Sequence, residues 1–336
     1  MTPPSETPRN PVLVVEQLSV HYATAGGDAK AVDRVSFTLQ PGERLGLIGE
    51  SGSGKTTLGM ALMRLTRPPG RIAGGRVLLE GRDLLALSPR ALRAARLRDI
   101  ALIPQGAMSA LNPVMRLEEQ MIDAIAPRLP AMTCAVLDAR VAALLAGVGL
   151  DASAARKYPH QLSGGMKQRA AMAIATSLQP KVIVADEPTS ALDVVVQRQV
   201  MQTLGRLQGG LGAAVVVIGH DMGLIAQFAD TVGVMYAGCL VEIGPVEAVI
   251  ADPRHPYTRL LVDSLPTIDG RKRLVGIPGL PPSLVDLPPS CGFHPRCPYA
   301  MPRCEAETPE PQQLGPARSA ACHLYPAHAT LPERHV

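Results

Sequence analysis

Tryptophan is absent from the 336-residue sequence, and aromatic residues make up only 3% of it. The hydrophobic core must therefore be built mainly from aliphatic residues, alanine and methionine. No apolar run reaches the ~18 residues that a membrane-spanning helix needs, and residues 1–11 lack the apolar centre of a signal peptide. These absences predict a cytoplasmic chain with a short disordered lead over residues 1–11.

A strong charge of either sign is also missing, because the formal net charge is only +4. A charge this small does not by itself indicate a nucleic-acid partner. The length suggests one large domain, or one domain with an appendage. Proline becomes dense beyond residue 252 and the regular hydrophobic periodicity fades there, so we expect the appendage at the C-terminal end.

The most informative stretch is residues 49–57, whose sequence G-E-S-G-S-G-K-T-T fits the pattern G-x-x-x-x-G-K-[ST]. An apolar run at 44–48 predicts a buried strand before it, and residues 58–65 predict a helix after it. Glycines let backbone N–H groups turn inward around a phosphate chain, and the helix start directs its positive dipole end at the same anion. The lysine would reach the β- and γ-phosphates, and the next threonine would bind Mg²⁺. The residues assigned to the nucleotide are Gly49, Ser51, Gly52, Ser53, Gly54, Lys55, Thr56 and Thr57.

Two acids, Asp186 and Glu187, follow a fully apolar run at 182–185, which predicts a strand covered on both faces. An acid at the carboxyl end of a strand beside a phosphate loop can hold Mg²⁺, directly or through water. Asp186 is assigned that role. Glu187 would lie near the γ-phosphate, as the general base or as the residue that positions an attacking water.

A second anion site is indicated at residues 162–166, L-S-G-G-M, which precede an alanine-rich helix. Ser163 is expected to cap this helix, and Gly164 and Gly165 leave the backbone N–H groups bare. Since one chain does not need two γ-phosphate sites, we expect this one to serve the nucleotide of a facing subunit.

The remaining pattern alternates helices with short strands. From residue 118 to about 155 it is helical, without strand signals, which indicates a helical insertion. From residue 163 onward helices and strands alternate, and residues 214–218 form a second fully apolar run. The pattern predicts an α/β fold.

Six motifs occur in one order along the chain. They are the phosphate loop, Gln105 after a strand, L-S-G-G-M at 162–166, the acid pair at 186–187, S-A-L-D at 190–193, and His220 after a strand. This set resembles that of the ATPase subunits of ABC transporters, over roughly residues 12–244. The resemblance implies a P-loop NTPase fold of the ABC ATPase type, with a helical subdomain and an antiparallel β edge region.

The same resemblance implies roles for further residues. Tyr22 would stack on adenine, and His220 would hold the γ-phosphate. Gln105 would contact Mg²⁺ and the attacking water, and Asp193 would link two subunits. Two such subunits would sandwich two ATP molecules, each between one subunit's phosphate loop and residues 163–165 of the other. ATP would then favour the closed pair, and hydrolysis would release it.

Five further stretches, residues 107–114, 158–160, 255–258, 277–282 and 291–297, resemble the dipeptide/oligopeptide and nickel importer ATPases. This narrower resemblance implies a peripheral subunit at the cytoplasmic face of the inner membrane that drives uptake of di- or oligopeptides. It also implies three kinds of partner: a second, paralogous ABC ATPase subunit, two integral-membrane permease subunits and an extracytoplasmic substrate-binding protein. Nickel or another non-peptide solute remains an alternative.

Four of the six cysteines lie near the C-terminus, with the spacing C-x5-C-x6-C-x17-C. In a reducing compartment such clustering favours a metal over disulfides. The spacing does not fit a zinc ribbon, whereas four thiolates can hold an iron–sulfur cluster, and the family resemblance implies a [4Fe–4S] cluster here. Zinc, with His294 or His323 as a substitute ligand, and free or disulfide-bonded thiols stay open. The four residues are Cys291, Cys297, Cys304 and Cys322.

The predicted organisation has three parts. A lead over residues 1–11 is followed by an ABC nucleotide-binding domain over 12–252, whose helical subdomain covers about 106–165. A C-terminal oligopeptide-transporter-type module with the four cysteines covers 253–336.

Two rival functions come from other classes. A soluble ABC ATPase that acts on nucleic acid or ribosomes commonly has two ATPase units or inserted zinc modules. This chain has one unit and its clustered cysteines lie outside it, so no nucleic-acid partner is expected. A non-hydrolysing regulatory subunit is disfavoured by the presence of Glu187 and His220.

Overall fold

The computed structural model describes residues 10–106, 110–265, 276–285, 287 and 289–325. Contacts between residues divide the chain into two compact units, and each is described by itself. The first contains the described parts of residues 1–14, 38–44 and 78–218, and the second those of 15–37, 45–77 and 219–336. Most of the predicted lead, and residues 107–109 of the predicted helical subdomain, lie outside the described residues.

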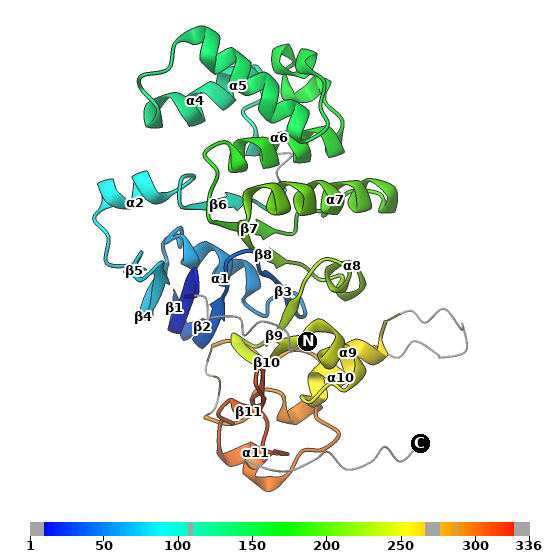
Figure 1. Cartoon of the computed structure of the whole chain (residues 1–336). Coiled ribbons are helices and arrows are strands. Elements are labelled where there is room, and N and C mark those ends of the chain that lie inside the picture. The colour runs from blue at the N-terminus through cyan, green and yellow to red at the C-terminus, as the bar shows by residue number, and fades with distance from the viewer. Residues whose placement is uncertain (1–9, 107–109, 266–275, 286, 288, 326–336) are drawn as a thin grey trace, which may run out of the picture. The chain divides into compact units, whose positions relative to one another are not determined.

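The first unit is mainly helical around the strands β6, β7 and β8, with the short strand β5 in addition (Figure 1). Its elements are β5 (Arg82–Asp83), α2 (Pro89–Ala95), β6 (Ile100–Ile103), α4 (Leu117–Ile125), α5 (Cys134–Gly147), α6 (Gly164–Thr176), β7 (Val182–Asp186), α7 (Val194–Leu211) and β8 (Ala214–Ile218). Short 3-10 turns lie at Ala126–Arg128, Ala152–Arg156 and Pro159–Gln161.

The core of this unit is a parallel arrangement of β6, β7 and β8. Ala185 of β7 lies opposite Ile103 on one side and Val217 on the other. Both β7 and β8 are buried along their whole lengths, which confirms the prediction made from their continuous apolar runs. Helix α6 contacts both β6 and α7.

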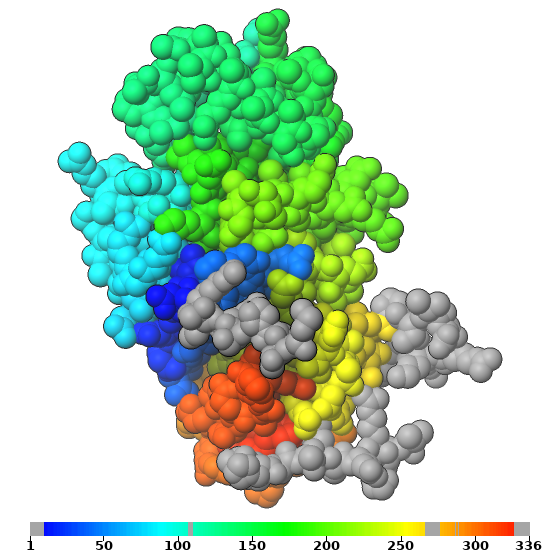
Figure 2. All heavy atoms as spheres, viewed as in Figure 1, coloured from blue at the N-terminus to red at the C-terminus, as the bar shows by residue number. Residues whose placement is uncertain are grey.

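The expected helical insertion is formed by α4, α5 and the turns around them. On α5, Leu137, Val141 and Leu145 recur every four residues and are buried, which is the spacing of a single helix face. Both helices contact α6, and the space-filling view in Figure 2 shows their side chains as one continuous body.

The second unit holds most of the strands. Its elements are β1 (Leu13–Thr24), β2 (Gly27–Leu39), β3 (Arg44–Ile48), α1 (Lys55–Leu62), β4 (Gly70–Leu79), α8 (Met222–Ala226), β9 (Thr231–Tyr236), β10 (Cys239–Pro245), α9 (Val246–Ala251), α10 (Pro256–Asp263), α11 (Pro302–Ala306), β11 (Gln312–Gly315) and β12 (Arg318–Ala320). A 3-10 turn lies at His294–Arg296. Strands β1, β2, β3 and β4 each have one end in the first unit.

Two groups of strands organise this unit. β3 pairs in parallel with β9, β10 runs antiparallel to β9, and β12 and then β11 continue antiparallel beyond β10. Strands β2, β1 and β4 are neighbours in that order in another sheet. The family resemblance implies an antiparallel β edge region, and in this unit β9, β10, β12 and β11 pair in antiparallel fashion.

Regular structure continues further into the C-terminal residues than the fading periodicity suggests, since α10, α11, β11 and β12 all lie beyond residue 252. Proline is compatible with these helices because Pro256 and Pro302 occupy their first turns. No N–H group is needed there, and the fixed φ of proline suits the helix start.

Candidate functional site

The phosphate loop has the predicted local structure. Strand β3 ends at Ile48, helix α1 begins at Lys55, and Gly54 stands at the helix start with a positive φ of 100°. Ser53 and Lys55 are only 4% and 6% exposed. The strand, glycine-rich turn and helix that a phosphate-binding loop requires are therefore in place.

The loop curls around its own lysine. The Lys55 ammonium donates to the backbone oxygens of Gly49 at 2.9 Å and Glu50 at 2.8 Å, and to the Ser53 hydroxyl at 3.1 Å. These bonds place a positive charge inside the loop. An anion is the group that such a charge and the helix start both attract.

The loop glycines show where a ligand can approach. A Cβ on Gly54 would lie 2.0 Å from the backbone oxygen of Ala31. The loop therefore packs directly against the backbone at Ala31 on this side, and no ligand can approach there. A Cβ on Gly52, whose φ is +79°, would meet no atom within 4 Å. The open side of the loop is thus at Gly52, and the loop's shape and charge fit a phosphate chain.

The acid pair lies at the end of β7 in the first unit. Asp186 is 1% exposed. The backbone N–H of Glu187 donates to the oxygen of Ile218 at 2.9 Å, and its φ is +43°. Gln105 follows β6, and its Nε2 donates to the Glu187 carboxylate at 2.8 Å. Two residues predicted for the same reaction step therefore lie together, and the amide fixes the direction of the carboxylate.

The L-S-G-G-M segment also forms a helix start. Ser163 is the predicted cap, because its hydroxyl accepts from the backbone N–H of Met166 at 3.3 Å at the start of α6. A Cβ on Gly165 would lie 2.6 Å from a side-chain carbon of Val196 in α7, so these helix starts pack closely. Asp193 caps α7 by accepting from the N–H groups of residues 195 and 196. The structure thus gives Asp193 a local capping role that the sequence interpretation missed, although an aspartate before an apolar helical run signals it.

Tyr22 and His220 belong to the second unit. The Tyr22 ring packs against the backbone of Gly70, where a Cβ would lie 2.6 Å from a ring carbon. His220 is exposed just after the end of β8. Their predicted contacts with adenine and the γ-phosphate stay predictions.

One contact of the loop was not anticipated. Glu50 occupies a variable position of the loop pattern, and its carboxylate forms two hydrogen bonds with the Arg296 guanidinium, at 2.8 and 2.9 Å. Its backbone N–H donates to the Tyr257 hydroxyl at 2.8 Å. The only signal for this in the sequence is an acidic side chain inside a loop built for anions.

The structure gives no support for a metal centre at the four late cysteines. All four are described, and no group of three or more histidine, cysteine, aspartate or glutamate side chains that could hold a metal ion occurs among the described residues. Burial raises the pKa of Cys297 to about 11 and that of Cys322 to about 12. His294 and His323 instead share hydrogen bonds with backbone oxygens. The predicted [4Fe–4S] cluster and its zinc alternative therefore have no support.

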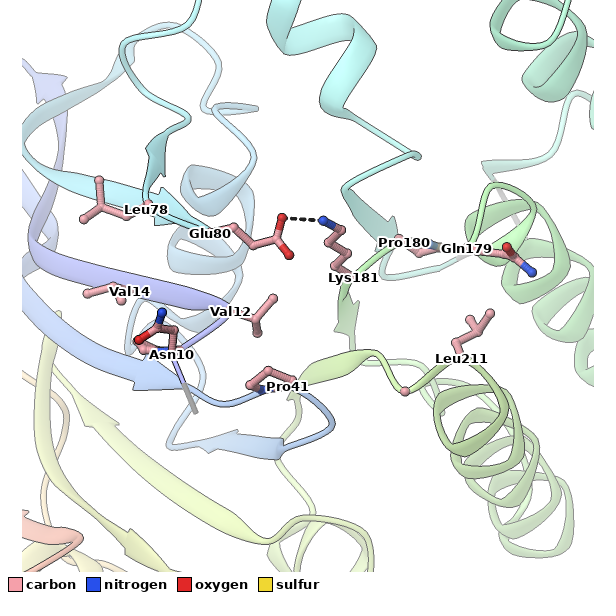
Figure 3. A pocket seen from close by; sticks show the side chains of 13 residues that line it. Asn10, Val12, Val14, Pro41, Leu78, Glu80, Gln179, Pro180, Lys181 and Leu211 are labelled. Carbon is pink, nitrogen blue, oxygen red and sulfur yellow. Dashed lines mark hydrogen bonds and ion pairs between the residues drawn. The ribbon is translucent and has the colours of Figure 1, made fainter. Parts of the chain in front are cut away.

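Figure 3 shows a pocket of about 680 Å³ that lies wholly within the first unit. Its walls are largely apolar, with an ion pair between Glu80 and Lys181. None of the residues assigned to the nucleotide lines it. The lining residues are Asn10, Pro11, Val12, Val14, Pro41, Leu78, Glu80, Gly81, Gln179, Pro180, Lys181, Leu211 and Gly212.

Across the residues that the structure describes, no helix combines the length and the apolar character that crossing a bilayer demands.

Comparison with known proteins gives a consistent result over almost the whole chain. The family model "ABC transporter" matches residues 32–190, and the model "Oligopeptide/dipeptide transporter, C-terminal region" matches residues 241–304. The dipeptide transport ATP-binding protein DppD of Escherichia coli is 41% identical over 94% of this chain and 97% of its own length. The oligopeptide transport ATP-binding protein OppD of Salmonella typhimurium is 41% identical over 94% of both chains.

Solved structures agree with the fold. A dimeric structure of a bacterial ABC transporter cassette is 26% identical, has a TM-score of 0.63, and covers 70% of this chain and 98% of the cassette. A dimeric post-hydrolysis state of the same ATP-binding cassette, bound to ADP and phosphate, matches with the same TM-score, identity and coverage.

Proposed function

Because this chain belongs to the family of ATP-binding subunits of dipeptide and oligopeptide ABC transporters, we propose that it hydrolyses ATP to drive peptide uptake through a separate permease. The observation that carries the peptide assignment is the 41% identity to DppD over 94% of the chain, which includes the C-terminal region. The ATPase assignment rests on the phosphate loop, with Lys55 inside it and an open side at Gly52.

The assignment of chemical roles follows from the donor sets. Backbone N–H groups of residues 49–57 and the Lys55 ammonium neutralise the phosphates. Thr56, Gln105 and Asp186 carry oxygen atoms of the kind that Mg²⁺ prefers, and the ion supplies further neutralisation of phosphate charge. Glu187, held by Gln105, takes the proton of the attacking water.

Two residues complete the proposed nucleotide site. His220 contacts the γ-phosphate, and Tyr22 stacks on adenine. Ser163, Gly164 and Gly165 contact the nucleotide of a second ABC ATPase subunit, a paralogue, across a dimer. Asp193 supports that contact by fixing the start of α7. One chain holds one phosphate loop and one L-S-G-G-M segment, so the arrangement needs a partner.

The proposed assembly lies on the cytoplasmic face of the membrane, with two permease subunits and an extracytoplasmic peptide-binding protein. The proposed division into a domain over residues 12–252, with a helical subdomain at about 106–165, and a module over 253–336 is part of the same reading. The iron–sulfur cluster is not part of this proposal.

The proposal is tested by isolating the complex. Tagged Glu187→Gln protein, which should retain ATP, is recovered in mild detergent from its native membranes with ATP and Mg²⁺, and the co-purifying proteins are identified by mass spectrometry. We expect two polytopic membrane subunits and a second ATPase. Recovery from the soluble fraction with nucleic acid or ribosomes, and with no membrane protein, would refute the transport function. If the extracytoplasmic binding protein that co-purifies bound nickel and not peptides, only the peptide assignment would be refuted.

A further inference from the structure

Glu50, the second residue of the phosphate loop, is fixed at every polar group it has. Its backbone N–H donates to the Tyr257 hydroxyl, its backbone oxygen accepts from Lys55, and its two carboxylate oxygens accept from Arg296. Arg296 and Tyr257 both come from residues more than 200 positions further along the chain. All of these residues belong to the second unit.

The arginine is held in place independently of the carboxylate. Its Nε donates to the backbone oxygen of Pro278 at 2.7 Å, and one terminal nitrogen donates to the Tyr236 hydroxyl at 3.1 Å. The Arg296 side chain is 5% exposed and that of Glu50 is 25% exposed. The Glu50 carboxylate also raises the pKa of Arg296, so the guanidinium is always charged. This is a preorganised bidentate pair, the strong form of a charge-assisted hydrogen bond.

An aromatic cluster supports both contacts. The rings of Tyr236 and Tyr257 have centroids 4.6 Å apart, and Phe293 lies 5.2 Å from Tyr236 and 5.5 Å from Tyr257. Tyr257 is fully buried. The Tyr257 hydroxyl, which accepts from the Glu50 N–H, and the Tyr236 hydroxyl, which accepts from Arg296, therefore belong to one packed aromatic cluster.

The charge of Glu50 needs this arrangement. A carboxylate beside a loop that binds a polyanion repels the ligand, and the repulsion is large where water is partly excluded. Pairing with Arg296 neutralises the negative charge of the Glu50 carboxylate locally. It also holds the loop backbone at Glu50 in one conformation before the nucleotide binds. Removing only the arginine would leave an unpaired carboxylate next to the phosphates.

We propose that Arg296 is a positioning residue of the nucleotide site, which acts through Glu50 to neutralise and fix the phosphate loop. The C-terminal region is in this way part of the ATP-binding apparatus. This inference rests on the proposed ATPase function, and it assigns Arg296 no contact with ATP itself.

A double-mutant cycle in the full-length chain tests the inference. Affinity for a fluorescent ATP analogue is measured for Arg296→Gln, Glu50→Gln and the double variant. We expect Arg296→Gln to weaken binding at least ~10-fold, because it strands a partly buried charge. The double variant should bind within ~3-fold of Glu50→Gln, since coupled residues are not additive. Arg303→Ala is the matched control, because Arg303 pairs with Glu307 on the surface of the same region.

Steady-state kinetics distinguish a positioning role of Arg296 from a general loss of folded, active protein. Arg296→Gln should raise KM for ATP by the same factor as the dissociation constant while kcat at saturating ATP stays within ~3-fold, because the arginine contacts no reacting group. Arg296→Lys should recover part of the affinity, since lysine keeps the positive charge but cannot donate the two parallel hydrogen bonds of a guanidinium. Additive losses in the cycle, or an Arg296→Gln affinity equal to that of Arg303→Ala, would overturn the inference. If the wild-type chain itself bound no ATP, the proposed function would fail instead.

Discussion

Lowering the pH should destabilise the chain through His255. This side chain is 1% exposed, and burial lowers its pKa from 6.5 to about 3. Between these two values the unfolded chain binds a proton that the folded chain does not, so stability falls as the pH falls. At pH 5, which is 1.5 units below the unfolded pKa, the loss is about 2 kcal/mol at 1.36 kcal/mol per unit.

The position of His255 ties this titration to the candidate site. Its Nδ1 accepts from the backbone N–H of Tyr257 at 3.1 Å and so caps α10. Protonation would remove that acceptor. Tyr257 in turn receives the N–H of Glu50, so acid should loosen the support of the phosphate loop as well as the fold.

The variant His255→Asn isolates the effect, because asparagine is a favoured helix cap and does not titrate in this range. Urea unfolding of both proteins at pH 7 and pH 5 gives two differences in the free energy of unfolding. The wild-type difference should exceed that of the variant by about 2 kcal/mol, while contributions from other groups cancel. Equal pH dependence in the two proteins would refute the reasoning.

Three further outcomes are expected. Glu187→Gln should bind ATP normally and hydrolyse it at least ~100-fold more slowly, because it lacks the proton acceptor; near-normal turnover in a phosphate-release assay would remove Glu187 from that role. Gly54→Ala should reduce ATP affinity at least ~10-fold, since its Cβ meets backbone at 2.0 Å and its φ is +100°, whereas Gly74→Ala, which meets no atom within 4 Å, should bind as the wild type does. Arg318→Ala should cost about 3 kcal/mol in urea unfolding, because it removes the charged partner that contacts the fully buried Glu242 carboxylate at 2.9 Å and leaves only the backbone N–H groups of Arg254 and His255. A loss below about 1 kcal/mol would show that water reaches this carboxylate.

Local features of the site could be predicted because each depends on neighbouring residues. The phosphate loop needs only its glycines, its lysine and the flanking strand and helix, and all are where the pattern indicates. Ser163 was assigned as a helix cap from a short polar residue before a helical run, and it caps α6. The buried strand β7 follows from a continuous apolar run.

Contacts between distant segments could not be predicted in this way. Arg296 meets Glu50 across 246 positions, and nothing in the local sequence of either residue selects the other. The pairing of β12 with β10 is likewise set by tertiary packing. The iron–sulfur prediction was drawn from the clustering of four cysteines and a family resemblance, and neither determines how the four side chains are arranged in space, on which a metal site depends.

Peptide uptake by the reconstituted complex tests the central claim most directly. Proteoliposomes that carry the whole complex, with ATP and Mg²⁺ enclosed and the peptide-binding protein outside, are given a labelled dipeptide. Uptake should be rapid with the wild-type subunit, accompanied by phosphate release, and should fall to the level of vesicles without ATP when Glu187→Gln replaces it. Dipeptide uptake that proceeds equally with both subunits would contradict the account.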